Sequence, residues 1–179
     1  VPALGLEKRA LSLDPGGADI TVSRNGPWRG EISMDQCIKS LKEEFAREPY
    51  ARMFGIEIQE LEAGHAILKM KTNEMMNNLF RTTHGAAIYS LLDAAFELTV
   101  NSHGTVAVAL GVNVSYLSPA RPGETLRAEG KETNRSRKIS SCEIRVTGED
   151  GRLVATCQAL AYRMRDRLPF LPPEAPPSS

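Results

Sequence analysis

The segment 84–100 constrains the fold more than any other, because apolar residues occupy almost every face of the helix it would form. A helix that is apolar all round must be buried on all sides. The apolar run is shorter than the roughly 20 residues that cross a bilayer, so we expect no membrane span. The segment therefore predicts a long central helix enclosed by other elements of one domain.

Alternation of apolar and polar residues indicates that most of the remaining chain forms strands. Ala63-Gly64 separates two alternating runs between 56 and 70, which predicts a hairpin. Further alternating runs follow the central helix at 106–117, 125–132, 139–147 and 153–164. We therefore expect an antiparallel sheet that curves around the helix.

The register of the last hairpin follows from its turn. Asp150-Gly151 is typical of a two-residue turn, which would pair Glu149 with Arg152. Small and apolar residues of the two strands then share one face: Cys142, Ile144 and Val146 opposite Ala159, Cys157 and Ala155. Such a face leaves room for a helix. Its two cysteines are diagonal neighbours, too far apart for a good disulfide, so we expect two reduced core thiols.

The two ends of the chain differ from its middle. Residues 1–31 are rich in turn formers and predict an irregular arm, or alternatively a docking segment anchored by Trp28. Ser33 has the spacing of a capping box with Gln36, which predicts a helix that ends before Pro49. Prolines make residues 168–179 a tail. The expected domain, residues 32–167, is an α+β hotdog fold: a long central helix wrapped by a curved antiparallel sheet, with an N-terminal helix.

Charge and cysteine usage restrict the partners and the compartment. Lys+Arg and Asp+Glu both number 22, so no net charge favours nucleic acid or anionic lipid. Cys37, Cys142 and Cys157 form no CxxC pair and no His cluster lies near them, which argues against a structural zinc. A reducing compartment fits this sparse set, and residues 1–15 lack a signal-peptide pattern, so we expect a cytoplasmic protein.

Two residues of the central helix suggest chemistry. Asp93 is a carboxylate in apolar surroundings, which is costly unless the group is functional; the alternative is a solvated residue on an exposed strip. Gly85 at the helix start would expose backbone N–H groups as an oxyanion site, or alternatively allows close packing. About 12 Å of helix axis separates them. Two antiparallel copies of the helix would bring Gly85 of one subunit beside Asp93 of its partner, so function would require a homodimer.

With these residues the chain resembles the phenylacetate-pathway (PaaI-type) hotdog acyl-CoA thioesterases over about residues 45–165. The resemblance rests on Asn78, His84-Gly85, Asp93, Asn101-Ser102, Tyr116-Leu117-Ser118-Pro119-Ala120 and Gly123-Glu124-Thr125-Leu126. It implies an acyl-coenzyme A substrate, dimers that share a continuous sheet and pair into a homotetramer, and no metal or separate cofactor.

The resemblance also implies residue roles. Asp93 is the general base or the nucleophile, Gly85 donates its N–H to the oxyanion, and Asn78 orients water or thioester from the facing subunit. His84 lies on the opposite side of the helix from Asp93 and is a supporting hydrogen-bonding residue. Independently of the resemblance, Glu97 lies one turn after Asp93, where it either tunes Asp93 or faces solvent or an interface. One loop contains three basic residues that would contact the phosphates of coenzyme A: Arg135, Arg137 and Lys138. Alternatively, they form an ordinary charged surface.

Two departures from the family pattern keep alternatives open. Ala86 replaces a second glycine, which should narrow the space beside the helix start. Ala109 replaces a hydroxyl residue that positions water, so the water is held by fewer partners, or by Asn113 or Ser115. The expected function is hydrolysis of a small or medium acyl-CoA, aryl groups included. A non-catalytic acyl-CoA binding module is the alternative. Enoyl-thioester hydration is a weaker one, because no histidine faces Asp93.

Overall fold

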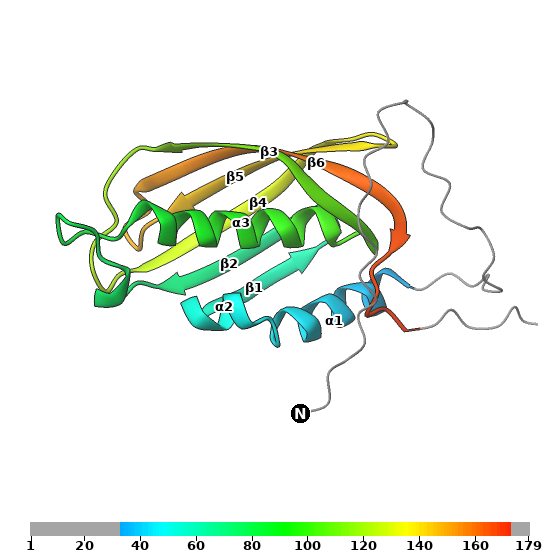
Figure 1. Ribbon diagram of the computed structural model, residues 1–179, viewed down its shortest axis with the longest axis horizontal. Helices are drawn as coiled ribbons and strands as arrows, with labels where there is room; N and C mark the ends of the chain where they lie inside the picture. The colour runs from blue at the N-terminus through cyan, green and yellow to red at the C-terminus, as the bar shows by residue number, and fades with distance from the viewer. Residues whose placement is uncertain (1–32, 173–179) are drawn as a thin grey trace, which may run out of the picture.

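A curved antiparallel sheet wraps around one long helix, α3 (Gly85–Asn101), as Figure 1 shows. The computed structural model describes residues 33–172. The strand order across the sheet is β1-β2-β4-β5-β6-β3. The strands are β1 (Ile56–Glu62), β2 (His65–Lys71), β3 (Thr105–Tyr116), β4 (Thr125–Arg135), β5 (Ile139–Thr147) and β6 (Leu153–Arg167). The predicted hotdog architecture is confirmed, while the arm at 1–31 and most of the tail lie outside the described residues.

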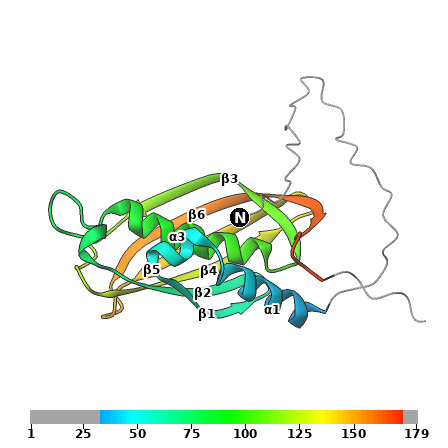
Figure 2. The ribbon, with the colours of Figure 1, turned by 60° about the horizontal axis from the view of Figure 1, so that its bottom comes forward.

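Two short helices precede the sheet. In α1 (Met34–Phe45) the Ser33 hydroxyl oxygen accepts the Gln36 N–H at 3.2 Å, as the capping-box spacing predicts. Figures 1 and 2 both show α1 beside β1. The second helix, α2 (Pro49–Phe54), was not predicted from the sequence. Pro49 suits the first turn of a helix and Gly55 ends it at φ 63°, but six residues are too few for a helical repeat to be recognised.

The last hairpin has the predicted interior register and a different turn. Cys142 lies opposite Ala159 and Ile144 opposite Cys157, and both thiols are free and buried. The pairing of Glu149 with Arg152 is wrong, because the register shifts after Val146 and the connection spans 148–152. There the Gly148 N–H donates to the Arg152 carbonyl at 2.9 Å, and only Gly151 has a positive φ, 76°. A two-residue type I′ turn needs two such residues.

The core forms where small residues of the sheet let α3 approach. A Cβ built on Gly130 of β4 would lie 2.5 Å from Thr99 Oγ1, so only glycine allows this contact. Leu91, Leu92 and Leu98 of α3 are fully buried. The prediction that α3 is enclosed on all sides is wrong for the single chain, because a stripe at helical spacing stays exposed: Ala86, Tyr89, Asp93 and Glu97. The sheet and α2 leave this side of α3 uncovered.

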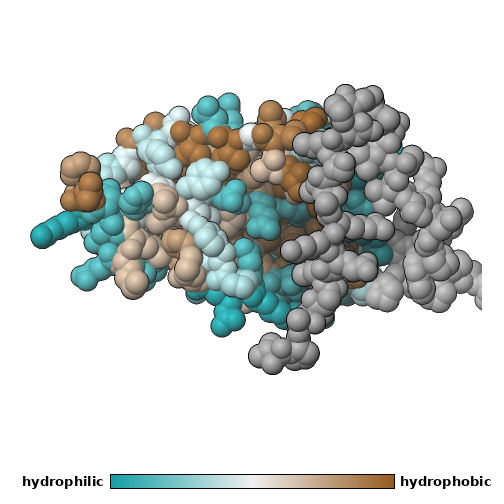
Figure 3. Space-filling view, viewed as in Figure 1, coloured by the Kyte–Doolittle hydropathy of each residue, from teal (hydrophilic) through white to brown (hydrophobic). Residues whose placement is uncertain are grey.

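The edge strand β3 is the most exposed strand of the sheet, and large apolar residues on it include Val108 and Leu110. Figure 3 shows apolar surface along the edge where Figure 1 places β3. At the far end of β6, Leu168 is buried and Phe170 and Leu171 pack against the core. Within residues 33–172, no helix is both long and apolar enough to cross a bilayer.

Candidate active site

The start of α3 has one unpaired backbone donor. His84 is the N-cap: its Nδ1 accepts the Ala86 N–H at 3.0 Å, and its carbonyl oxygen accepts the N–H groups of Ala87 at 3.0 Å and Ile88 at 3.4 Å. Among the hydrogen bonds of the described residues, none uses the Gly85 N–H. His84 thus saturates the next donors of the first turn and leaves the Gly85 N–H available to a ligand.

Tyr116, the last residue of β3, lies directly against Gly85. Its hydroxyl donates to the Gly85 carbonyl oxygen at 3.1 Å, and a Cβ on Gly85 would lie 3.3 Å from Tyr116 Cζ. Gly85 thus permits a close contact with Tyr116 and also has a free N–H, while its role as an oxyanion donor stays a prediction. The family motif includes Tyr116, but its sequence pattern predicts no role for this residue, because the contact joins residues 31 positions apart.

Asp93 stands on the exposed stripe of α3 among other carboxyls. Partial desolvation of its carboxyl raises the pKa of Asp93. Desolvation, followed by the nearby charges of Glu48 and Asp93, raises the pKa of Glu97 to about 7. Desolvation and then Asp93 also raise the pKa of Glu48, the residue that precedes α2. The charge of Asp93 thus acts on Glu97, which is itself exposed; a tuning effect of Glu97 on Asp93 stays a prediction.

The position of α2 explains why Glu48 was missed. Tyr50 of α2 and Ser90 of α3 are joined by a hydrogen bond of 2.9 Å between their hydroxyls. This contact holds the start of α2 against the middle of α3, which places Glu48 near the carboxyls of Asp93 and Glu97. Because the sequence did not predict α2, it gave no reason to place Glu48 near the site.

Asn78 lies in the loop that precedes α3 and organises that loop. Its Oδ1 accepts the N–H groups of Phe80 at 2.8 Å and Thr82 at 3.2 Å, and its Nδ2 donates to Thr82 Oγ1 at 2.9 Å. The turn holds the side chains of Leu79 and Phe80 in solvent, 96% and 84% exposed. In the single chain, Asn78 thus shapes a protruding apolar tip, and one Nδ2 hydrogen is left for another acceptor.

The predicted site residues do not all meet within one chain. Gly85 and Asp93 share one side of α3 but are about 12 Å apart along its axis. The loop with Arg135, Arg137 and Lys138 lies at the opposite end of the helix from Gly85, where Arg135 Nε is 4.0 Å from Glu132 Oε1 and Glu132 in turn contacts His103. Ala109 is exposed on β3, as are Asn113 and Ser115. A complete site needs residues from elsewhere.

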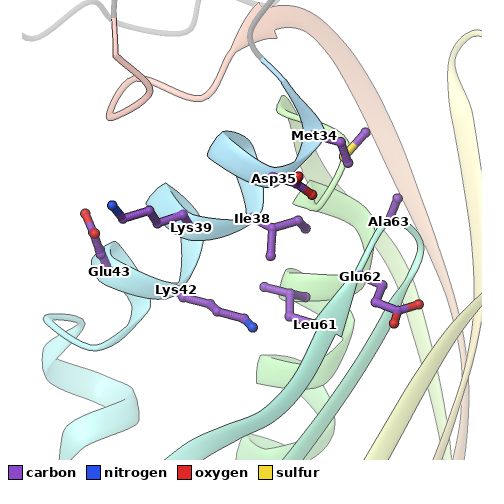
Figure 4. Close-up of a pocket in the computed structure, with 9 residues that line it drawn as sticks. All are labelled: Met34, Asp35, Ile38, Lys39, Lys42, Glu43, Leu61, Glu62 and Ala63. Carbon is purple, nitrogen blue, oxygen red and sulfur yellow. The ribbon is translucent and has the colours of Figure 1, made fainter.

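Two further features of the described residues concern metal binding and a pocket away from α3. Within the described residues, no group of His, Cys, Asp and Glu side chains is arranged to hold a metal ion. A hollow of about 560 Å³ lies between α1 and β1, with Ile38 and Leu61 facing each other across it and charged residues such as Lys42 at its rim (Figure 4). It contains none of the site residues of α3.

Comparison with known proteins assigns the family. Residues 80–155 match the thioesterase superfamily. A putative esterase of Archaeoglobus fulgidus is 35% identical over 63% of this chain and 73% of its own length. The acyl-coenzyme A thioesterase PaaI of Escherichia coli is 27% identical over 67% of this chain and 86% of its own length.

A solved structure agrees with this assignment. A mutant of the phenylacetic acid degradation protein PaaI from Thermus thermophilus is 31% identical, with a TM-score of 0.63 over 65% of this chain and all of that one. Sequence and fold thus give the same answer: the chain is a hotdog protein that belongs to the thioesterase superfamily.

Proposed function

We propose that the protein hydrolyses small or medium acyl-coenzyme A thioesters, aryl groups included, at sites shared between two copies of the chain. The observation that carries the proposal is the uncovered side of α3, where Asp93 has a carboxyl of raised pKa, together with the free N–H of Gly85 at the start of the same helix. The name of the E. coli relative, an acyl-coenzyme A thioesterase, supports the substrate class.

In the proposed reaction, the thioester carbonyl oxygen accepts the Gly85 N–H, where the positive end of the α3 dipole stabilises the developing oxyanion. Asp93 of the partner subunit either removes a proton from the attacking water or attacks the carbonyl itself. When Asp93 acts as the base, the water oxygen forms the new C–O bond, the C–S bond breaks, and the thiolate of coenzyme A leaves with the proton that Asp93 removed. When Asp93 attacks, the C–S bond breaks as the acyl-Asp93 anhydride forms; water then hydrolyses the anhydride, which frees the acid and the carboxylate and supplies the proton that the thiolate takes up. Asn78 positions the water or the thioester, and His84 supports the helix start.

The proposed dimer would pair the exposed sides of two α3 helices. Antiparallel packing of two α3 helices covers the exposed stripe and places each Gly85 beside the partner's Asp93, with Tyr89 near the two-fold axis. The exposed edge of β3, with Val108 and Leu110, would continue the sheet into the partner, and two dimers would form a homotetramer. The same symmetry moves the basic loop at 135–138 of the partner toward the Gly85 end, where it could bind the phosphates of coenzyme A.

The proposal also covers the compartment of the protein and the extent of its catalytic domain. The three cysteines are free and buried, which supports a reducing compartment such as the cytoplasm. Residues 32–167 form the proposed catalytic domain. Coenzyme A enters as part of the substrate, and the proposed chemistry uses only side chains and the backbone.

A non-catalytic acyl-CoA binding module is the second candidate. The methyl group of Ala109 is exposed on β3 where the family places a hydroxyl, so a water there has one partner fewer. Release of free thiol from a panel of acyl-CoAs separates the two candidates. We expect turnover by the wild type and a loss of about 10³-fold in Asp93→Asn, while Asp35→Asn on α1 keeps wild-type activity. Tight binding without turnover would favour the binding module.

Subunit mixing tests the shared site. In a heterodimer of Asn78→Ala and Asp93→Ala chains, one site carries both changes and the other carries neither. We expect the isolated heterodimer to have about half the activity of the wild type, because one of its two sites is intact. Verified heterodimers that stay inactive would contradict a site built from two chains.

A further inference from the structure

We propose that Tyr116 is a positioning residue for the reaction: its hydroxyl holds Gly85 in the orientation that presents the free N–H to the thioester. This inference rests on the proposed function. Tyr116 donates to the Gly85 carbonyl oxygen at 3.1 Å, and its ring is the nearest group to Gly85 on the side where a Cβ would lie. The carbonyl of Gly85, the residue with the free N–H, is thus held by the Tyr116 hydroxyl.

Tyr116 is itself held rigidly. It pairs with Ala155 in the β3–β6 ladder, and the next two residues, Leu117 and Ser118, both donate their N–H groups to the Val154 carbonyl oxygen. Ser118 Oγ also donates to the Leu153 carbonyl oxygen at 2.5 Å. A group on a well-paired strand can fix its contact within a fraction of an ångström, as positioning of a catalytic donor demands.

Gly85 needs such support more than other residues would. Glycine has the widest conformational freedom, and Gly85 is the first residue of α3, where helices fray. The carbonyl that Tyr116 binds belongs to the same residue as the free N–H, so a shift of this residue moves the donor. Desolvation, followed by the charge of Cys157, raises the pKa of Tyr116, so its hydroxyl keeps the proton that it donates.

A purely structural role for this hydrogen bond is less well supported. Tyr116 is 52% exposed, and a hydrogen bond that competes with water adds little to the free energy of unfolding. Its effect on catalysis is larger, because a displaced donor loses contact with charge that develops only in the transition state. Removal of the hydroxyl should therefore lower kcat more than it changes stability or KM.

The test compares Tyr116→Phe with Tyr162→Phe, a control on β6 whose residue is 37% exposed. We expect Tyr116→Phe to lower kcat about tenfold with KM within about twofold of the wild type and the melting temperature within about 2 °C, while Tyr162→Phe leaves all three unchanged. Tyr116→Ala, which also removes the ring, should lower kcat at least as much.

Three outcomes would overturn the inference or its basis. An unchanged kcat in Tyr116→Phe, with an active wild type, contradicts the role of Tyr116 alone. A raised KM with an unchanged kcat would assign Tyr116 to substrate binding and overturn the positioning role. A wild-type protein without turnover on any acyl-CoA would contradict the proposed function, and the role of Tyr116 with it.

Discussion

The two ends of α3 treat their backbone polar groups in opposite ways. At the C-terminal end, Asn101 Oδ1 accepts the Ala107 N–H at 2.9 Å and its Nδ2 donates to the Glu97 carbonyl oxygen at 2.9 Å. Ser102 Oγ accepts the Gly64 N–H at 2.8 Å and donates to the Thr99 carbonyl oxygen at 2.7 Å. Both side chains are buried. This end is closed, and both side chains pair with backbone groups around it.

At the N-terminal end, His84 and Tyr116 are exposed and the Gly85 N–H has no partner among the described residues. Native proteins pair almost all their buried polar groups, and the unpaired donor lies where a ligand can reach it. The two ends of α3 therefore differ in role. The C-terminal end stabilises the fold through its hydrogen bonds, whereas the N-terminal end keeps a free N–H that can bind a substrate. Two asparagines, one at each end, allow this difference to be tested.

Asn101→Ala should have the largest effect on stability. It removes the acceptor of the Ala107 N–H and a donor to two carbonyl oxygens in a site where Asn101 is 7% exposed. We expect the free energy of unfolding to fall by about 3 kcal/mol and the melting temperature by about 10 °C. Activity per folded molecule should stay near that of the wild type. Urea unfolding and thiol release check both values, and a loss below about 1 kcal/mol would contradict the comparison.

Asn78→Ala should lower activity strongly and stability only slightly, the reverse of Asn101→Ala. The loop that it organises is partly exposed, so we expect the free energy of unfolding to fall by less than about 1 kcal/mol. The loss of its hydrogen bonds should disorganise the loop beside the helix start and lower kcat/KM about 30-fold. Steady-state kinetics and thermal unfolding measure the two effects. A variant as unstable as Asn101→Ala would remove the distinction between the ends.

Glu97→Gln should change how stability depends on pH. A carboxyl whose pKa rises from 4.5 to about 7 on folding holds its proton more tightly in the folded state, so its contribution is complete at low pH and is lost as the pH rises through this range. Screening at a partly exposed site reduces the effect to about 1 kcal/mol. The variant should match the wild type at pH 4 and exceed its stability at pH 8.

Unfolding measured at both pH values checks this prediction, with Glu60→Gln, an exposed change on β1, as the control. Equal pH dependence in wild type and Glu97→Gln would show that the carboxyl cluster around Asp93 does not affect stability.

Ala86→Gly should have the smallest effect on activity and stability, and it tests the space beside Gly85 at the N-terminal end of α3. Ala86 is exposed beside Gly85, and we expect its methyl group to narrow the approach to the free N–H. We expect the glycine to raise kcat/KM about twofold and to lower the melting temperature by about 2 °C, because glycine weakens a helix. Lower kcat/KM would show that helix order matters more here than space.

Local patterns predicted most of the fold. Helical periodicity and a capping-box spacing were enough for α1, and alternation with turn residues was enough for the strands and for the β5–β6 pairing of Ile144 with Cys157. The site was predicted in part, since Gly85 was correctly placed at the start of α3. Neither the hydrogen bond from Tyr116 nor the charge of Glu48 was foreseen, because both depend on which distant elements pack beside α3.

The sequence by itself determined the long helices and the strands of this protein, since periodicity and turn residues act over a few neighbouring positions. Only the tertiary structure decided which donor at the helix start stays unpaired and which side of α3 stays uncovered. Those properties arise from contacts between residues far apart in the chain, such as Tyr116 with Gly85 and Tyr50 with Ser90. Their geometry depends on the twist and closure of the whole sheet, which no local pattern encodes.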